Sequence, residues 1–204
     1  MLLYDSVGPN PRFVRMFAAE RGITLPKVTV DLRGGENRQA PYLAKNPAGG
    51  LPALELDNGF VLAEITAIAE YLDEIAPSGH SLVGANALER AETRMWTRRI
   101  DLQIVEPLTA GFRYAEGLKM FQSRMHCIPQ AADDFKKIAQ QKLGWLNGLM
   151  EGKDFVCGKR LTMADILLFA FLDFGKNVGQ GIDPAHTNIA AHYERMKARP
   201  SAAA

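Results

Sequence analysis

Apolar and polar residues follow two different patterns along the chain, and the pattern changes near residue 76. Before that point, short apolar runs of strand length alternate with segments whose apolar residues recur at helical spacing. The resulting order, β-α-β-α-β-β-α, indicates a small mixed sheet that carries helices. The pattern predicts strands over 1–5, 27–32, 53–56 and 60–63, and helices over 11–22, 37–46 and 64–76.

The second pattern begins after residues 77–86, which contain the Pro, Gly and Ser typical of a linker. From residue 87 to 204, strand signals nearly vanish and helical stretches replace them. Thr162 and Asp165 have the spacing of a capping box, so Asp165 is interpreted as a helix cap rather than a catalytic acid. Helices are expected over 87–112, 129–150, 161–172 and 190–201, with Pro107 bending or ending the first.

Composition excludes several classes of function. The chain has 204 residues, 47% of them hydrophobic, with 24 Lys and Arg against 23 Asp and Glu. Such balanced charge provides no field that draws a protein to nucleic acid, so we expect no nucleic-acid partner. Because no apolar run approaches the ~20 residues of a membrane span and the N-terminus lacks a secretory signal, we expect a cytoplasmic protein without a membrane partner.

The cysteines and histidines do not suggest a metal centre. Cys127 and Cys157 lie far apart and fit neither a metal-ligand spacing nor a disulfide framework. The four histidines are scattered, although His126 lies beside Cys127. We therefore expect no bound metal.

An unusual stretch, Gly49-Gly50-Leu51-Pro52, leads into the strand predicted over 53–56. Proline removes a hydrogen-bond donor from a sheet, and strands tolerate it only at an edge, at a bulge or as the first residue. A strand introduced by two glycines and a proline suggests a backbone that does something besides pair within the sheet.

Three motifs resemble those of a known family. The run "NPAGGLPALELDNGFVLAEITAIAEYL" over 46–72 resembles the pattern N-P-x-G-x-V-P-x-L-x-x-x-x-G-x-x-L-x-E-S-x-A-I-x-x-Y-L of the cytosolic glutathione transferases. "GENRQAPYLAKNP" resembles the G-E-H-K-x-P-x-F-L-A-x-N-P that precedes it in several classes, and "GKRLTMADILLFAFL" resembles their buried helix start. Together with the element order, the chain is similar to an atypical bacterial or fungal-like class of this family.

The resemblance implies a fold and a set of partners. An α+β thioredoxin-like domain over 1–76 would bind glutathione as co-substrate, and an all-α helical domain over 87–204 would form the electrophile site. The resemblance also implies a homodimer, to which the helix containing "TRMWTRRIDLQ" contributes.

For the co-substrate, the resemblance points to the main chain of Leu51. It implies a cis peptide bond before Pro52 and an outward-facing Leu51 backbone that pairs with the cysteinyl part of glutathione. An unpaired edge backbone is a template for an extended peptide, which makes this arrangement physically reasonable. A tight turn with Pro52 as first strand residue is the alternative without a ligand.

Side-chain contacts differ from the family pattern at three positions, Asn37, Arg38 and Ile65. Glu64 and Ile65 match the Glu-Ser pair that holds the γ-glutamyl end, but Ile65 lacks the hydroxyl, which Thr66 would supply. Asn37 and Arg38 replace a His-Lys pair, with Asn37 offering an amide hydrogen bond and Arg38 facing the glycine carboxylate of glutathione. Lys45 is an alternative carboxylate contact.

The thiol-activating group stays open between Ser6, Asn10 and the main-chain amides at the head of the helix near Pro11. A thiol with a pKa near ~8.5 must fall by roughly two units, which is about 3 kcal/mol. A hydrogen bond to a charged group supplies roughly 1.5–3 kcal/mol, so no single residue type is obligatory. Ser and Asn are also favoured helix caps.

The electrophile site is expected on the helices after residue 100, where the chain offers Phe112, Tyr114 and Ser123. A structural role in the core is the alternative for the aromatic residues. The leading function is a glutathione transferase acting on a small apolar electrophile. The alternatives are a non-catalytic scaffold with the same fold, and a glutathione-dependent disulfide reductase or peroxidase.

Overall fold

The computed structural model describes residues 1–77 and 79–204 and divides the chain into two compact units. The first contains Met1–Ala85 together with Pro200–Ala204, and the second contains Asn86–Arg199. The boundary after Ala85 falls within the predicted linker, of which Ser78 lies outside the described residues.

Residues 200–204, which the sequence assigned to the helical domain, group with the first unit in the structure. The 3₁₀ turn η4 (Pro200–Ala203) packs against the helix near the N-terminus. Arg12 Nη2 donates to the carbonyl of Ala202 at 3.0 Å, and the buried Ser201 hydroxyl donates to the Glu20 carboxylate. A five-residue ending carries no periodicity from which these contacts could be predicted.

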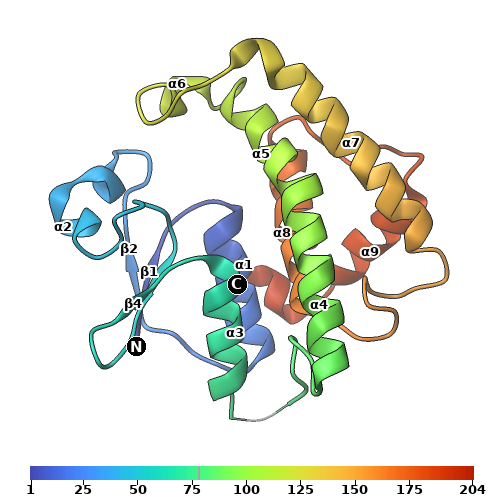
Figure 1. Ribbon diagram of the computed structural model, residues 1–204, viewed down its shortest axis with the longest axis horizontal. Coiled ribbons are helices and arrows are strands. Elements are labelled where there is room, and N and C mark those ends of the chain that lie inside the picture. Colours follow the sequence, from blue (N-terminus) through green and yellow to red (C-terminus); the bar gives the residue numbers. More distant parts are fainter. Residues whose placement is uncertain (78) are drawn as a thin grey trace. The chain divides into compact units, whose positions relative to one another are not determined.

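The first unit is a four-stranded mixed sheet in the order β2-β1-β3-β4. β1 pairs parallel with β2, whereas the β1–β3 and β3–β4 pairs are antiparallel. Figure 1 shows α1 and α3 together on one side of the sheet and α2 on the other. The elements are β1 (Leu2–Asp5), α1 (Pro9–Glu20), β2 (Lys27–Thr29), η1 (Glu36–Arg38), α2 (Ala40–Leu43), β3 (Ala53–Glu55), β4 (Val61–Leu62) and α3 (Ile65–Ile75).

The predicted strand over 27–32 is shorter than expected because Asp31 begins a turn. Its N–H donates to Glu36 Oε2 at 2.7 Å, and its Oδ1 accepts the N–H of Gly34 at 2.8 Å. These local bonds compete with strand pairing, so β2 ends at Thr29.

The core of the first unit lies between the sheet and the pair α1 and α3. Leu3 and Leu54 stand opposite each other on β1 and β3, and both are fully buried. Phe13 and Phe17 of α1 pack with their ring centroids 6.1 Å apart. Burial of each such side chain contributes roughly 1.5–3 kcal/mol.

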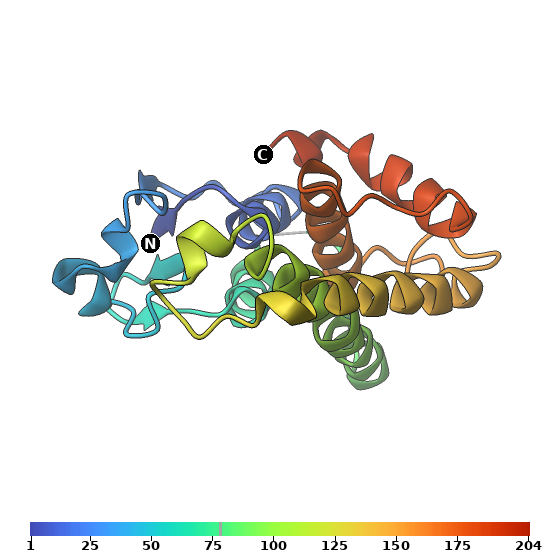
Figure 2. The same cartoon turned by 90° about the horizontal axis from the view of Figure 1, so that it is seen from above.

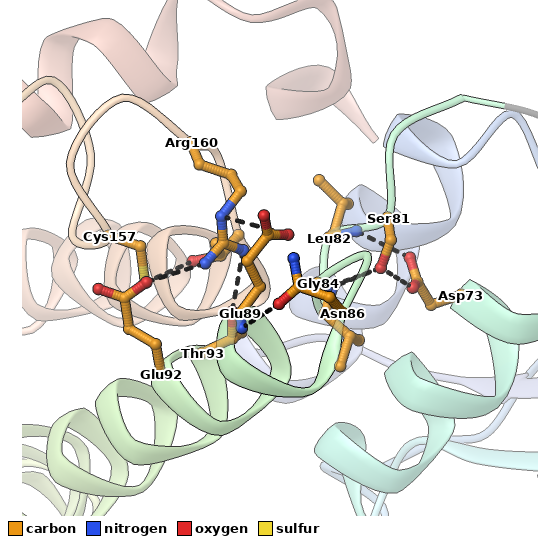
Figure 3. A network of polar contacts seen from close by, with 12 residues as sticks. Asp73, Ser81, Leu82, Gly84, Asn86, Glu89, Glu92, Thr93, Cys157 and Arg160 are labelled. Carbon is orange, nitrogen blue, oxygen red and sulfur yellow. Dashed lines mark hydrogen bonds and ion pairs between the residues drawn. The ribbon is translucent and has the colours of Figure 1, made fainter.

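Asp73 on α3 holds the segment that leaves this helix. It forms a buried ion pair with Arg21 Nε at 2.8 Å and accepts the N–H of Leu82 at 2.9 Å. The Ser81 hydroxyl donates to the same carboxylate at 2.5 Å, as Figure 3 shows.

The second unit is helical, as predicted. Figures 1 and 2 show α7 beside α5 and α9, and these pairs are in contact. The whole run from Met163 to Leu172 in α8 is buried, which makes this helix the centre of the unit. The elements are α4 (Ala87–Ile100), η2 (Asp101–Val105), α5 (Glu106–Arg113), α6 (Leu118–Phe121), η3 (Pro129–Ala131), α7 (Ala132–Leu149), α8 (Met163–Asn177) and α9 (Thr187–Lys197).

Pro107 divides the long helix as the sequence indicated. Proline has no N–H to donate, and its ring would collide with the carbonyl one turn earlier in a regular α-helix. The residues of η2, just before Pro107, adopt the wider π-helical form. This form accommodates the hydrogen bond that Pro107 cannot donate where α4 passes into α5.

Asp165 caps α8 and is fully buried, so its interpretation as a structural residue is confirmed. Its carboxylate accepts the N–H of Thr162 at 2.8 Å and of Val156 at 2.7 Å, and lies 3.0 Å from His192 Nε2.

The loop before α8 is also bonded to α4. Arg160 bonds Glu92 at 3.0 Å and Thr93 at 3.1 Å (Figure 3).

The mixed sheet with its helices is a thioredoxin-like unit, followed by a helical unit. The fold class inferred from the sequence is therefore confirmed.

Candidate functional site

Three segments named from the sequence meet at one end of the sheet. Tyr4 stands opposite Ala53, and because β1 and β3 are antiparallel, the end of β1 lies beside the start of β3. Leu54 stands opposite Leu62, so the end of β4 also lies beside the start of β3. If both registers are continued, the loop after β1, the Leu51–Pro52 segment and the start of α3 lie at the same end of the sheet.

At this end of the sheet, the main chain of Leu51 is free to form hydrogen bonds. The Leu51–Pro52 peptide bond is cis, as the resemblance predicted. Among residues 1–77 and 79–204, neither the N–H nor the C=O of Leu51 has a hydrogen-bond partner. Its side chain packs on the cluster of Tyr4, Val30, Tyr42 and Ala53. An extended peptide could therefore pair with this residue as an added strand does.

The head of α3 offers unpaired donors. The first bond of the helix joins the Ile68 N–H to the carbonyl of Glu64 at 3.0 Å, which leaves the N–H groups of Ile65, Thr66 and Ala67 outside the helical ladder. In the described part of the chain, the hydroxyl of the half-buried Thr66 has no partner. Such a helix start is suited to a carboxylate.

Glu64 has a backbone conformation that other residue types avoid. Its φ of 67° and ψ of 118° make it the one non-glycine residue with positive φ among the described residues. Such conformations cost roughly 1–3 kcal/mol and cluster at functional sites. Its side chain is exposed and accepts no hydrogen bond from an N–H of α3.

Of the two cationic side chains considered for a carboxylate, Arg38 is the freer. It is exposed, and Nη1 donates to the carbonyl of Ala48 at 3.2 Å. Lys45 instead contacts Glu55 at 2.9 Å and lies 5.0 Å above the Tyr4 ring. Hydrogen bonds to Tyr4 and Glu55 raise the pKa of Lys45 to about 12, so these partners hold its ammonium group.

Asn37 points inward rather than toward a ligand. Only 2% of the residue is exposed, and Nδ2 donates to the carbonyl of Gly49 at 2.6 Å. The expectation that Asn37 contacts glutathione is therefore not supported. Tyr42 and Asn46, which the sequence did not single out, bind the next carbonyl, that of Gly50. A tyrosine and an asparagine shortly before a double glycine were the available signals.

The Ser6 hydroxyl also has a hydrogen-bond partner within the protein. It is 8% exposed, and its hydroxyl donates to the carbonyl of Val30 at 2.7 Å. A thiolate would need that same proton, because a hydroxyl has only one to donate. Arg15 fixes the loop by bonding Asp5 at 2.7 Å and the Ser6 carbonyl at 3.2 Å.

The head of α1 has few donors because prolines occupy two of its first three positions. Pro9 and Pro11 have no N–H, and the Arg12 N–H already bonds the Gly8 carbonyl at 3.3 Å. In this turn, within the described residues, Asn10 keeps an unpaired main-chain N–H. Asn10 is exposed, and its side chain has no partner among the same residues, so it offers a second donor.

The residues expected to hold an electrophile lie in the second unit. Phe112 is half-buried, with its ring centroid 5.0 Å from that of Phe174 and 6.1 Å from that of Phe121. Tyr114 packs edge-on against Phe135 at 5.7 Å. Ser123 is exposed beyond α6. The aromatic residues thus build the local core and expose only part of their surface.

Two further findings concern what the described residues contain. No group of three or more His, Cys, Asp or Glu side chains in them is arranged to hold a metal ion. The same residues include no helix with both the length and the apolar character to cross a membrane.

Comparison with known proteins identifies the family. The glutathione S-transferase N-terminal domain family matches residues 7–75, and the C-terminal domain family matches residues 122–204. Glutathione S-transferase 2 of Saccharomyces cerevisiae is 31% identical over 98% of this chain and 87% of that protein. The chain belongs to the glutathione S-transferase family of enzymes.

Solved structures agree. A glutathione S-transferase domain-containing protein of Marinobacter aquaeolei superposes with a TM-score of 0.92 at 36% identity, covering 98% of this chain and 99% of that one. A glutathione transferase homologue from Sulfitobacter, solved with bound glutathione, superposes with a TM-score of 0.81 at 25% identity. That match covers 99% of this chain and 94% of the homologue.

Substitution of the two adjacent glycines of the loop by alanine should lower stability to different extents. Gly49 has a φ of 63°, and a Cβ there would lie 2.9 Å from Arg38 Nη1 and 3.0 Å from the Asn37 carbonyl oxygen. Gly49→Ala should therefore lower the free energy of unfolding by about 1–2 kcal/mol, measured by urea unfolding.

Gly50→Ala is the matched control, because the nearest atom to its Cβ is Asn46 Nδ2 at 3.8 Å. Its urea midpoint should move much less. Equal midpoints for the two variants would contradict the described loop geometry.

Proposed function

We propose that this chain is a glutathione transferase that binds glutathione along the edge at Leu51 and presents its sulfur as a thiolate to a small apolar electrophile. The single observation that carries the proposal is the unpaired Leu51 main chain at the sheet end that α1 and α3 share. The cysteinyl backbone of glutathione would pair there. Membership of the glutathione S-transferase family and the bound glutathione of the Sulfitobacter homologue support this assignment.

The two ends of the tripeptide would be held by different charges. The α-carboxylate of the γ-glutamyl end would accept from the N–H groups of Ile65 and Thr66 and from the Thr66 hydroxyl, and Glu64 would face its amine. The glycine carboxylate would meet the exposed guanidinium of Arg38. In this assignment, the N–H groups at the start of α3 and the Thr66 hydroxyl take the place of the serine that the family pattern has at position 65.

Thiol activation is assigned to Asn10 rather than to Ser6. The side-chain amide and main-chain N–H of Asn10 are neutral donors at the positive end of α1, and neither has another partner among the described residues. Two hydrogen bonds to a thiolate, at roughly 1.5–3 kcal/mol each, meet the requirement of about 3 kcal/mol.

In the reaction, the thiol proton leaves to solvent and the sulfur electron pair forms a bond to an electrophilic carbon. In a substitution, the leaving group departs with its electron pair. Phe112 and Tyr114 would offer the apolar surface and Ser123 a hydroxyl donor for the electrophile.

Glutathione affinity and reaction type test the proposal together. The wild-type chain should be retained on immobilised glutathione, elute with free glutathione and conjugate chlorodinitrobenzene. Arg38→Gln should raise the KM for glutathione by about tenfold because a charged hydrogen-bond partner is lost. Arg33→Gln is the control, since Arg33 is an exposed arginine on the neighbouring turn.

Absence of retention by the wild-type chain would favour the scaffold. Retention with reduction of disulfides but without conjugation would favour the reductase or peroxidase.

The ionisation of bound glutathione distinguishes Asn10 from Ser6. Asn10→Asp should raise the pKa of the bound thiol, because a carboxylate beside the sulfur repels the thiolate. Ultraviolet absorbance of the thiolate across a pH series measures that pKa. Ser6→Ala should lower stability through the loss of its bond to Val30, with little effect on the pKa.

The opposite result, in which Ser6→Ala shifts the thiol pKa and Asn10→Asp does not, would transfer the role to Ser6.

We also propose that the protein forms a homodimer through α4 and the turn after it. Leu88, Met95 and Leu102 recur every seven residues and are 81%, 41% and 51% exposed, respectively. Apolar residues at this spacing lie along one side of a helix. Such an exposed stripe is typical of an interface.

Introducing charge into this stripe should prevent dimer formation. The double variant Met95→Glu, Leu102→Glu should be monomeric by light scattering, whereas the wild type is dimeric, because the carboxylates would have to be desolvated at the interface. Ile138→Glu on α7, where the side chain is 42% exposed, is the control and should stay dimeric. A wild-type monomer would contradict the proposal.

A further inference from the structure

The two glycine carbonyls that precede Leu51 are held by side chains from η1, from α2 and from the turn after α2. The Gly49 carbonyl accepts from Asn37 at 2.6 Å. The Gly50 carbonyl accepts from the Tyr42 hydroxyl at 2.6 Å and from Asn46 Nδ2 at 2.9 Å. Three neutral donors therefore converge on two consecutive carbonyl oxygens.

The bonds to Gly50 determine the direction of a group on the next residue. The Gly50 carbonyl and the Leu51 N–H belong to one planar peptide unit, and in a trans unit they point in opposite directions. This unit is trans, because the cis bond lies one peptide later. Drawing the Gly50 oxygen toward Tyr42 and Asn46 therefore turns the Leu51 N–H away from them.

Tyr42 makes this anchor rigid. It is 5% exposed, belongs to the same cluster as Tyr4, and meets the Tyr4 ring edge-on at 6.1 Å. Leu51 itself packs against this cluster. A buried tyrosine has few rotamers available, so its hydroxyl holds the acceptor in a narrow range of positions.

The Tyr42 hydroxyl also stays protonated at working pH. Burial raises the pKa of Tyr42 to about 12. The donor is therefore present across the whole pH range in which a thiolate would be used.

We propose that Tyr42 is a positioning residue for the extended peptide ligand: by holding the Gly50 carbonyl, together with Asn46, it aims the Leu51 N–H at the cysteinyl carbonyl of glutathione. This inference rests on the proposed function. It assigns affinity for the tripeptide, and not the chemical step, to a hydroxyl that touches neither ligand nor sulfur.

Tyr42→Phe removes the hydroxyl and keeps the ring. The KM for glutathione should rise by about five- to tenfold, the usual effect of one neutral hydrogen bond, while kcat at saturating glutathione stays within about twofold. Asn46→Ala should raise the KM in the same way because it shares the acceptor. Tyr71→Phe on α3 is the control and should change neither constant, because the half-buried tyrosine forms no hydrogen bond with this loop among the described residues.

A second readout needs no ligand. The ¹⁵N order parameter of the Leu51 amide should be near ~0.85 in the wild type and fall in Tyr42→Phe, since the peptide unit loses one of its two anchors. Thermal unfolding of each variant verifies that it is folded.

The outcomes separate this inference from the proposed function. If the wild-type chain does not bind glutathione, the proposed function fails, and a lower Leu51 order parameter in Tyr42→Phe would still support the anchor. If glutathione binds and Tyr42→Phe changes neither the KM nor the order parameter, the inference fails alone. A loss confined to kcat would also overturn it.

Discussion

The peptide unit between Gly50 and Leu51 is hydrogen-bonded to the protein through its carbonyl and leaves its N–H unpaired. Its carbonyl bonds Tyr42 and Asn46, whereas the Leu51 N–H has no partner in the described part of the chain. An unpaired backbone group is tolerated only where it faces solvent or a ligand. Tyr42 of α2, Asn46 and the start of β3 at Ala53 leave this one residue outside the sheet ladder.

The antiparallel register then brings two helix starts to the same place. β3 is central in the pairs with β1 and β4, so the chain leaves both neighbours at the end where β3 begins. The segments that follow them open α1 and α3, whose first turns carry Asn10 and the Ile65–Thr66 pair. A peptide ligand on Leu51 would thus have its thiol near one positive helix end and its carboxylate near another.

Local patterns predicted the elements well because each has a local cause. The Thr162–Asp165 cap and the division at Pro107 depend on a few neighbouring residues, and both are present. The cis bond at Pro52, which the family resemblance implied, is present as well. The roles of Ser6 and Asn37 depend instead on carbonyls of Val30 and Gly49, which are distant in sequence and approach only in the folded chain. Residue type and position in the sequence do not reveal whether a hydroxyl or amide already has a partner, so Ser6 and Asn37 were both candidates for contacts with glutathione.

Main-chain recognition makes the departures from the family pattern compatible with binding in the proposed site. The N–H groups of Ile65 and Thr66 are oriented by α3 and do not depend on the serine hydroxyl that Ile65 lacks. Asn37 no longer offers its amide outward, but it fixes the Gly49 carbonyl beside the one that Tyr42 fixes. Immobilising a flexible side chain on binding costs roughly 0.5–1.5 kcal/mol, whereas backbone groups held by such anchors are ordered before the ligand arrives. In the proposed site, side chains that contact the loop instead of the ligand would therefore contribute to affinity through preorganisation.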